Sequence, residues 1–413
     1  MTRLPAWAVR LRTKRLDKGW SQKDMAKEIV EHADALGVRM PERNSLIRSI
    51  KGWEAGEHRP RHPYPMLYAR VFGTDEEALF GDPLEPSYRS PAEVLAAVMP
   101  EHDLLGPESD AHGRRRIDMG TVTDLSGRVH GLRLADDVLG GDDLIGPAFR
   151  ELDAAVRLYR ENTHDETVGR ALLGIIGEYA QIAGWIASDA GQEHQAVQSY
   201  RLGISAAREA GDHTLESNIL GSLAYLVANT GDPREGAELA LTSLDALKPW
   251  SPARARALAW DRVAWAHARE GNAQAAIRSL GESETALAGE YGQEPPSYLY
   301  WVNAGELQIM EARVFTELRR PLRAVPLLTK VLDRYDAAHA RELSLYLSWL
   351  AVALIDANEP EEAARTARRM LDLCADIASD RMTQRVRIVL QRLNVYQDVP
   401  EVRAVLTGYP FTA

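Results

Sequence analysis

The sequence predicts an all-α protein with a five-helix N-terminal domain, a helical linker and a C-terminal α-solenoid. Apolar residues recur at helical spacing along most of the chain, and no strand-like alternation of useful length occurs. In the C-terminal part a glycine followed by a helical segment recurs every 40 residues, which is typical of stacked helix pairs. A length of 413 residues favours two or three domains, which we place at 1–82, 83–147 and 148–413.

The composition is that of a globular protein. A hydrophobic share of 45% and a charged share of 26% exclude collagen-like and wholly disordered classes. The single cysteine, Cys374, excludes intramolecular disulfides and iron-sulfur clusters and fits a reducing compartment. No run of 18 apolar residues and no export signal is present, so we expect a cytoplasmic protein without a membrane partner. Because most basic residues are arginine, we expect a GC-rich bacterial source.

Charge is distributed unevenly along the chain. Residues 1–70 carry 15 Lys and Arg against 8 Asp and Glu, a balance of +7. The remaining 343 residues carry 34 against 52, a balance of −18. This asymmetry is expected when one module contacts phosphate and the other does not.

Five segments of the N-terminal domain have helical periodicity. They span residues 5–17, 21–36, 43–55, 65–72 and 75–80. Ser21 is expected to cap the second helix. In the third helix one face carries an apolar stripe, and the opposite face holds Asn44, Arg48, Lys51 and Gly52.

The N-terminal domain resembles the phage repressor and Cro-type helix-turn-helix domains of the XRE family. The motifs that carry the resemblance are Ser-Gln at 21–22, Trp-Glu-Ala-Gly at 53–56 and Arg-Pro at 59–60. The connection between the second and third helices is longer than the tight turn of the family. The resemblance implies that the third helix enters the major groove of double-stranded DNA while the preceding helix positions the backbone.

The same resemblance assigns DNA-contacting residues. The candidates for base contacts are Asn44, Ser45, Arg48, Ser49 and Lys51. Arg48 is the best candidate because a guanidinium can bind guanine through two hydrogen bonds. The candidates for phosphate contacts are Gln22, Lys23, Arg43, Arg59 and Arg61. The alternative is that these are ordinary polar surface residues. For Trp53, which shares the apolar stripe, core packing is favoured over stacking on single-stranded nucleic acid.

The linker at 83–147 is rich in Gly, Pro and Asp and contains two helix-like segments at 91–99 and 119–139. A Gly-Arg-Arg-Arg run at 113–116 is interpreted as a solvated turn, with a second phosphate contact as the alternative.

The C-terminal domain repeats a turn and a helix. The turns begin at Gly191, Gly231 and Gly271, where glycine is expected to supply a positive φ, and later units follow without the glycine. The pattern resembles tetratricopeptide repeats. Together with the N-terminal domain it is similar to the RRNPP quorum-sensing regulators, which implies a homodimer and a groove for a peptide or small-molecule effector. Candidate groove residues are Tyr159, Tyr179, Trp185, Asn218, Tyr225, Trp260, Trp265, Trp301 and Trp349. The alternative is that the aromatic residues are core.

No phosphate-binding loop, dinucleotide motif, nucleophile elbow or metalloprotease motif occurs, so we expect no enzyme, no cofactor and no metal. Cys374 is expected to be a buried, inert thiol. The predicted function is therefore a sequence-specific transcriptional regulator whose repeat domain binds a signal or a partner protein. Two alternatives remain: a protein-binding repeat scaffold without specific DNA binding, and an enzyme that uses the solenoid as a cradle.

Overall fold

A computed structural model describes residues 5–18, 20–34, 38, 40–74, 76–80, 116–289, 293–332, 340–374 and 380–409. These residues form α-helices and two short 3-10 helices, and a single bridge between Arg116 and Thr163 is the only strand-like pairing among them. The all-α prediction is confirmed. The chain divides into a first unit, residues 1–90, and a second unit, residues 91–413. The helix expected at 91–99 lies outside the described residues.

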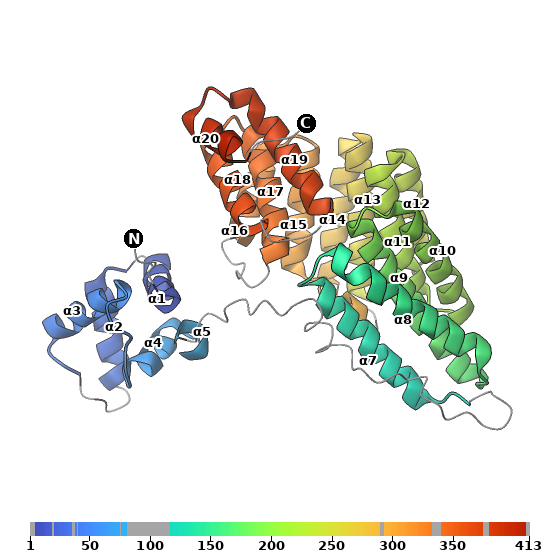
Figure 1. Cartoon of the computed structure of the whole chain (residues 1–413), viewed down its shortest axis with the longest axis horizontal. Coiled ribbons are helices and arrows are strands. Elements are labelled where there is room, and N and C mark those ends of the chain that lie inside the picture. The colour runs from blue at the N-terminus through green and yellow to red at the C-terminus, as the bar shows by residue number, and fades with distance from the viewer. Residues whose placement is uncertain are drawn as a thin grey trace. The chain divides into compact units, whose positions relative to one another are not determined.

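The first unit contains the five predicted helices. They are α1 (Ala6–Asp17), α2 (Gln22–Asp34), α3 (Arg43–Glu54), α4 (Tyr64–Phe72) and α5 (Glu76–Phe80) (Figure 1). The helices bury one shared core that includes Leu11, Met25, Ile29, Leu46 and Ile50. Trp53 belongs to this core: its ring lies 4.6 Å from that of Tyr64 and 6.0 Å from that of Tyr68. Core packing is therefore the role of Trp53 in the folded unit.

The second unit is a series of helices connected by short turns (Figure 1). They are α7 (Met119–Asp136), α8 (Gly141–Glu161), α9 (Glu166–Asp189), α10 (Glu193–Ala210), α11 (His213–Thr230), α12 (Pro233–Ala246), α13 (Ala253–Glu270), α14 (Ala273–Ala288), η1 (Ser297–Leu299), α15 (Ala304–Glu317), α16 (Pro321–Leu332), α17 (Ala340–Asp356), α18 (Pro360–Cys374), α19 (Asp380–Leu393), η2 (Asn394–Tyr396) and α20 (Pro400–Gly408).

The helices of the second unit pack as successive hairpins. Each of α9, α11, α13 and α17 packs closely against the helix that follows it, and α15 packs against α16. The odd-numbered helices from α7 to α19 also contact one another in series. They therefore form a common layer, and their facing side chains are the ones that can meet inside the unit.

Left-handed residues make several of the hairpin turns. Gly191 and Gly271 have φ values of 70° and 83°, as predicted. Gly231 differs, with φ of −116°, and its position is restricted instead because a Cβ there would lie 3.2 Å from the carbonyl oxygen of Val227. The later turns without glycine place Arg319 at φ 51° and Asn358 at φ 62°. Residues other than glycine rarely adopt this backbone conformation. These two turns therefore have the left-handed geometry without the glycine by which the earlier turns are recognised in the sequence.

The predicted linker contributes to the core of the second unit. α7 packs against α9 and buries Val122, Leu125, Val129 and Leu132, so the residues from 116 onward belong to the second unit. α8 begins at Gly141, before the expected boundary at 148. The start of α8 lies so close to the end of α9 that only glycine fits at position 141, since a Cβ there would lie 2.8 Å from the backbone nitrogen of Ala190. The apolar stripe of α7 has a partner in α9, and this burial explains why the segment is not a linker.

One described helix, α9, is long and apolar enough to cross a membrane by length and composition. Its apolar window is 67% buried inside the second unit. A core helix passes the same test, and the side chains of α9 are used in packing against α8, α10 and α7.

Candidate functional sites

The outward face of α3 is the first candidate site. Leu46, Ile50 and Trp53 hold the opposite face in the core of the first unit. The outward face exposes Arg43, Asn44, Ser45, Arg48 and Lys51, while Ser49 is half-buried and donates a hydrogen bond to the carbonyl oxygen of Ser45 at 3.2 Å. Gly52, predicted for this face, is buried because His58 and Glu57 cover it, with a Cβ there lying 2.9 Å from the His58 ring.

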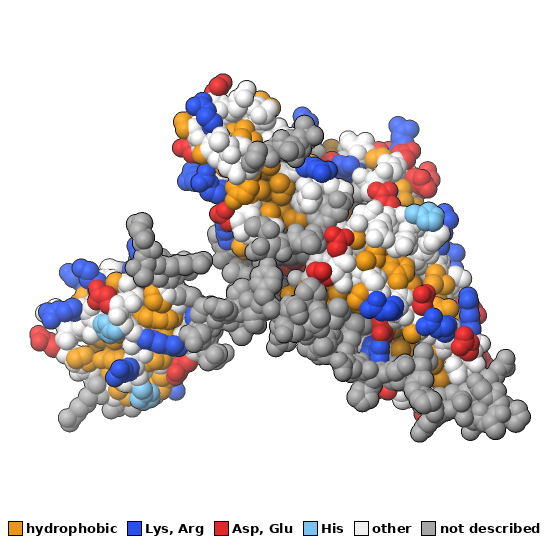
Figure 2. Space-filling model, in the orientation of Figure 1, with side chains coloured by type: hydrophobic (Ala, Val, Ile, Leu, Met, Phe, Trp, Pro, Cys, Tyr) orange, Lys and Arg blue, Asp and Glu red, His pale blue; other side chains and the backbone are white. Residues whose placement is uncertain are grey.

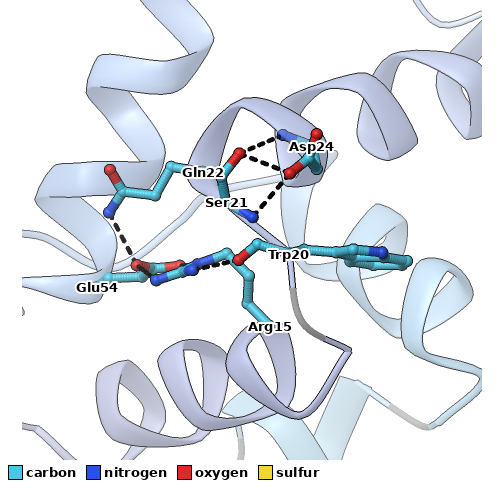
Figure 3. Close-up of polar contacts among 6 residues, drawn as sticks. All are labelled: Arg15, Trp20, Ser21, Gln22, Asp24 and Glu54. Atoms are coloured by element: carbon cyan, nitrogen blue, oxygen red, sulfur yellow. Dashed lines mark hydrogen bonds and ion pairs between the residues drawn. The ribbon is translucent and has the colours of Figure 1, made fainter.

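A buried ion pair fixes α3 against the start of the first unit (Figure 3). The guanidinium of Arg15 on α1 donates to both carboxylate oxygens of Glu54 at 2.6 and 2.8 Å, and to the carbonyl oxygen of Trp20 at 2.6 Å. The side-chain amide of Gln22 donates to Glu54 at 2.9 Å. Glu54 is the only carboxylate of α3, so the charge that α3 presents to solvent is entirely positive.

The start of α2 is capped as predicted (Figure 3). The Asp24 backbone N–H donates to the Ser21 hydroxyl at 3.3 Å, and the Ser21 backbone N–H donates to the Asp24 carboxylate at 2.8 Å. The Ser21 hydroxyl also donates to the same carboxylate oxygen at 2.6 Å, and these bonds lower the pKa of Asp24. The cap fixes the direction in which α2 enters the unit beside α3.

The predicted phosphate-contacting residues divide into two groups. Lys23, Arg43 and Arg61 have exposed side chains. Arg59 is also exposed but donates a hydrogen bond to the carbonyl oxygen of Phe80, and Gln22 is half-buried with its amide directed to Glu54. Figure 2 shows Lys and Arg side chains spread over the visible face of the first unit. Three of the five predicted phosphate-contacting residues are therefore exposed cations, and the other two make hydrogen bonds within the first unit.

The second candidate site lies among the odd-numbered helices of the second unit. Four predicted groove residues meet there in a row that we call the aromatic ladder: Trp185, Tyr225, Trp265 and Trp349. The ring centroids of successive members lie 5.8, 5.9 and 5.6 Å apart. These residues come from α9, α11, α13 and α17 of the odd-numbered layer, in which α15 contacts both α13 and α17.

The other predicted groove residues lie elsewhere. Tyr179 is buried and donates to the carbonyl oxygen of Leu125 at 3.3 Å. Tyr159 stacks on His164 at 4.8 Å. Trp260 and Trp301 are half-buried and pack against apolar core clusters. Asn218 lines a small cavity of about 10 Å³ beside Arg262. Core packing explains the aromatic members of this group.

Four arginines that were not among the predicted site residues surround the aromatic ladder. This arginine cluster consists of Arg262 on α13, Arg313 on α15, and Arg381 and Arg385 on α19. The Arg313 guanidinium carbon lies 5.5, 4.9 and 5.2 Å from the ring centroids of Tyr225, Trp265 and Trp349. The Arg385 guanidinium lies 3.6 Å from the Trp349 ring, and that of Arg381 lies 5.5 Å from Trp185. A charged residue inside the segments AWDRVAW and MEARVF is the sequence signal that could have found two of them.

Tyr225 lies at the centre of these charges. It accepts a hydrogen bond from Arg313, and the Arg262 guanidinium lies 4.9 Å from its ring. Burial opposes ionisation of the phenol, but the positive charges of Arg313, Arg381 and Arg262 outweigh it and lower the pKa of Tyr225 to about 7. For the nearby carboxyl of Asp261, burial outweighs the positive charges of Arg262 and Arg313 and raises the pKa to about 6.

A third feature is an open groove of about 830 Å³ between α7 and α9, near the start of α11. Its lining contains side chains of both charge signs: Arg170 is basic, and Glu178 and Asp212 are acidic. The half-buried Glu178 pairs with Arg133 at 2.8 Å, and desolvation raises the pKa of its carboxyl. The groove therefore has no single charge preference.

Neither unit contains, among its described residues, a group of three or more His, Cys, Asp or Glu side chains that could hold a metal ion. Cys374 is half-buried, and burial raises the pKa of its thiol. No protein-family model matches the chain, and no curated protein is significantly similar to it. The functional assignment therefore depends on the two sites themselves.

Proposed function

We propose that this chain is a sequence-specific DNA-binding transcriptional regulator of the cytoplasm. In this proposal α2 and α3 form an XRE-type helix-turn-helix, and α3 enters the major groove of double-stranded DNA. The second unit is an α-solenoid of tetratricopeptide-like pairs that binds a signal and pairs two copies of the chain, as in the RRNPP quorum-sensing regulators.

The observation that carries the proposal is the outward face of α3. It presents Arg48, Asn44 and Lys51 to solvent, while the only carboxylate of the helix is buried against Arg15. Arginine and asparagine are the side chains that pair with the major-groove edges of guanine and adenine. The excess of basic residues in positions 1–70 supplies the electrostatic attraction to phosphate that such a helix needs.

Two copies are expected to bind together. One small helical unit makes few base contacts, and two units on half-sites about one helical turn apart double them. The selected DNA is therefore expected to contain a repeated or palindromic half-site.

Selection from fragmented genomic DNA of the source organism tests the proposal. The full chain is compared with Arg48→Ala/Lys51→Ala and with the control Arg70→Ala/Lys27→Ala, which removes the same charge from exposed positions on α4 and α2. The wild type and the control should enrich the same site at about 200 mM salt, whereas the α3 variant should not. If the wild type enriches no sequence, the protein-binding scaffold becomes the better account of the repeats.

A further inference from the structure

We infer that the arginine cluster and the aromatic ladder form a binding site for an oxyanion, the carboxylate or phosphate group of a small ligand. This inference rests on the proposed function only for its regulatory consequence, because the site itself is argued from the second unit alone.

The positive charges of the arginine cluster are only partly balanced by acidic side chains. Arg262 and Arg313 are only 6% and 7% exposed. The facing carboxylates are those of Asp261 and Asp189, and their ion pairs with Arg262 and Arg381 are long, at 3.9 and 4.0 Å. These separations exceed hydrogen-bonding distance. The Glu317 carboxylate also acts on Arg385 but is paired with Arg269 at 2.5 Å. Among the described residues, the four guanidiniums therefore have only the Tyr225 phenol and these carboxylates as acidic partners, and an anion would balance their remaining charge.

Three hydrogen-bond donors in the site lack an acceptor. Within the described part of the chain, the Nε of Arg313, the Nη2 of Arg385 and the Nε1 of Trp265 are buried without a hydrogen-bond acceptor. Arg313 and Arg385 both lie on the Trp349 ring, and the Trp265 ring is 5.6 Å from it, so the three donors share one neighbourhood. Buried donors are normally satisfied, and an oxyanion accepts strong, charge-assisted hydrogen bonds from guanidinium groups.

The exposure of the site residues indicates where the remainder of the ligand lies. The cavity beside Arg262 is about 10 Å³, which is room for a single water. In contrast Trp185 and Tyr225 are half-buried and the Arg381 side chain is 27% exposed. The cavity beside Arg262 is lined by no residue of the ladder, so the unused donors of Arg313 and Arg385 place the anionic group, and the body of the ligand lies at the more exposed end formed by Arg381 and Trp185.

The site also joins distant parts of the second unit. Arg381 and Arg385 belong to α19, whereas their counterparts Arg262 and Arg313 belong to α13 and α15. An anion held by both groups binds more tightly when these helices are close together than when they are apart. Such an anion would favour arrangements in which α19 lies close to α13 and α15, by the difference between its affinities for the two arrangements, and a regulatory ligand acts through a difference of this kind.

The test measures thermal unfolding of the full chain in sodium phosphate, sodium acetate and sodium chloride at equal ionic strength. We expect phosphate or acetate to raise the midpoint by several degrees relative to chloride, since an anion that binds only the folded state stabilises it. Arg313→Gln and Arg385→Gln should lose this shift. The control Arg170→Gln, an exposed residue of the α7 and α9 groove, should retain it. General exclusion of phosphate from protein surfaces acts on all variants alike and is subtracted by the comparison.

A second readout is made on the wild type, so that its main result does not depend on the folding of the arginine variants. An anion bound among the arginines reduces their effect on Tyr225, so phosphate or acetate should decrease the tyrosinate absorbance of the wild type slightly above neutral pH. Tyr225→Phe should abolish this change. The inference is overturned if wild type shows neither effect, if Arg313→Gln shifts as much as wild type, or if Arg170→Gln removes the shift. A shift with phosphate alone identifies a phosphate ligand, and a shift with acetate alone identifies a carboxylate.

DNA binding is measured in the same preparations by fluorescence anisotropy. A site-dependent anion shift in a protein that selects no DNA keeps this inference and rejects the proposed function. Selective DNA binding without the anion shift keeps the proposed function and rejects this inference.

Discussion

Two buried groups of charged residues differ in how their charges are balanced. In the first unit the Arg15 guanidinium meets the Glu54 carboxylate through two bonds, and both side chains are less than 10% exposed. In the second unit the Arg313 guanidinium instead donates to the phenol oxygen of Tyr225 and lies on the Trp265 ring. A buried charge is costly without a partner. Substitution of Glu54 should therefore destabilise the first unit, whereas substitutions in the arginine cluster should change the response of the second unit to an anion.

Glu54→Gln should destabilise the first unit by about 3 kcal/mol, because it leaves the Arg15 charge buried without a carboxylate. Hydrogen exchange of the α3 amides in the full chain measures this loss. The control is Glu31→Gln, which removes an exposed pair with Lys27 at 3.5 Å and should cost about 0.5 kcal/mol or less. Equal protection in the two variants would show that the buried pair does not stabilise α3.

Tyr225 should make stability depend on pH. The charged residues that face it are Asp261 and Arg262 on α13, Arg313 on α15, and Arg381 and Arg385 on α19. Its pKa is about 7 in the folded chain and about 10 in an unfolded one. The folded state therefore binds fewer protons between these values, and its advantage grows as the pH rises and is lost as the pH falls toward 7.

The free energy of unfolding of wild type minus that of Tyr225→Phe should therefore increase from pH 7 to 10, by at most about 1.4 kcal/mol per pH unit. Chemical unfolding at several pH values measures the difference, in which the titration of all other groups cancels. A difference that is flat with pH would mean that the arginines do not lower the pKa of this phenol.

Close helix approach determines the packing at the scale of elements. In the hairpin of α11 and α12, Gly236 faces Ala228 so closely that a Cβ would lie 2.7 Å from the Ala228 Cβ and 2.8 Å from its backbone. Gly281 on α14 has open space around it. Both glycines lie in helices, Gly236 in the first turn of α12 and Gly281 in the interior of α14, and their steric surroundings are opposite.

Gly236→Ala should therefore lower the stability of the second unit by about 1–3 kcal/mol, because the backbone of α11 must move. Gly281→Ala should raise it by about 0.5–1 kcal/mol, since alanine is the better helix former. Thermal unfolding of the two variants beside wild type measures both effects. The packing account fails if the two substitutions change stability in the same direction.

Periodicity predicted helices such as α2 and α3 well because each of them buries one main face. The stripe of Leu46, Ile50 and Trp53 was sufficient to identify the buried and exposed sides of α3. Periodicity could not say what the apolar stripe of α7 packs against, so this helix was expected in a linker. It also could not find Arg313 and Arg385, because residues far apart in sequence create that cluster only after the helices stack.

The opposite charges of the two parts of the chain support separate roles at the scale of the whole molecule. Residues 1–70 have a balance of +7 and the remainder −18. A positively charged unit is attracted to phosphate, whereas a negatively charged one is repelled and contributes little non-specific binding. In the proposed regulator, DNA recognition is therefore confined to the first unit and signal binding to the second.

The affinity of the full chain for DNA should fall as salt increases. Arg48→Ala/Lys51→Ala removes two of the positive charges on α3 and should make the logarithmic salt dependence shallower by up to about two counterions. Anisotropy titrations between about 50 and 200 mM salt measure the slope. A slope that does not change in this variant would place the DNA contacts away from α3.

The most direct test of the central claim compares the affinity for the selected site with that for a scrambled site at about 200 mM salt. The account predicts that wild type and the control Arg70→Ala/Lys27→Ala prefer the selected site by about a thousandfold or more. It also predicts that Arg48→Ala/Lys51→Ala loses most of this preference, since one base contact contributes about 1–3 kcal/mol. Equal affinity of the wild type for the two DNAs would contradict sequence-specific recognition by α3.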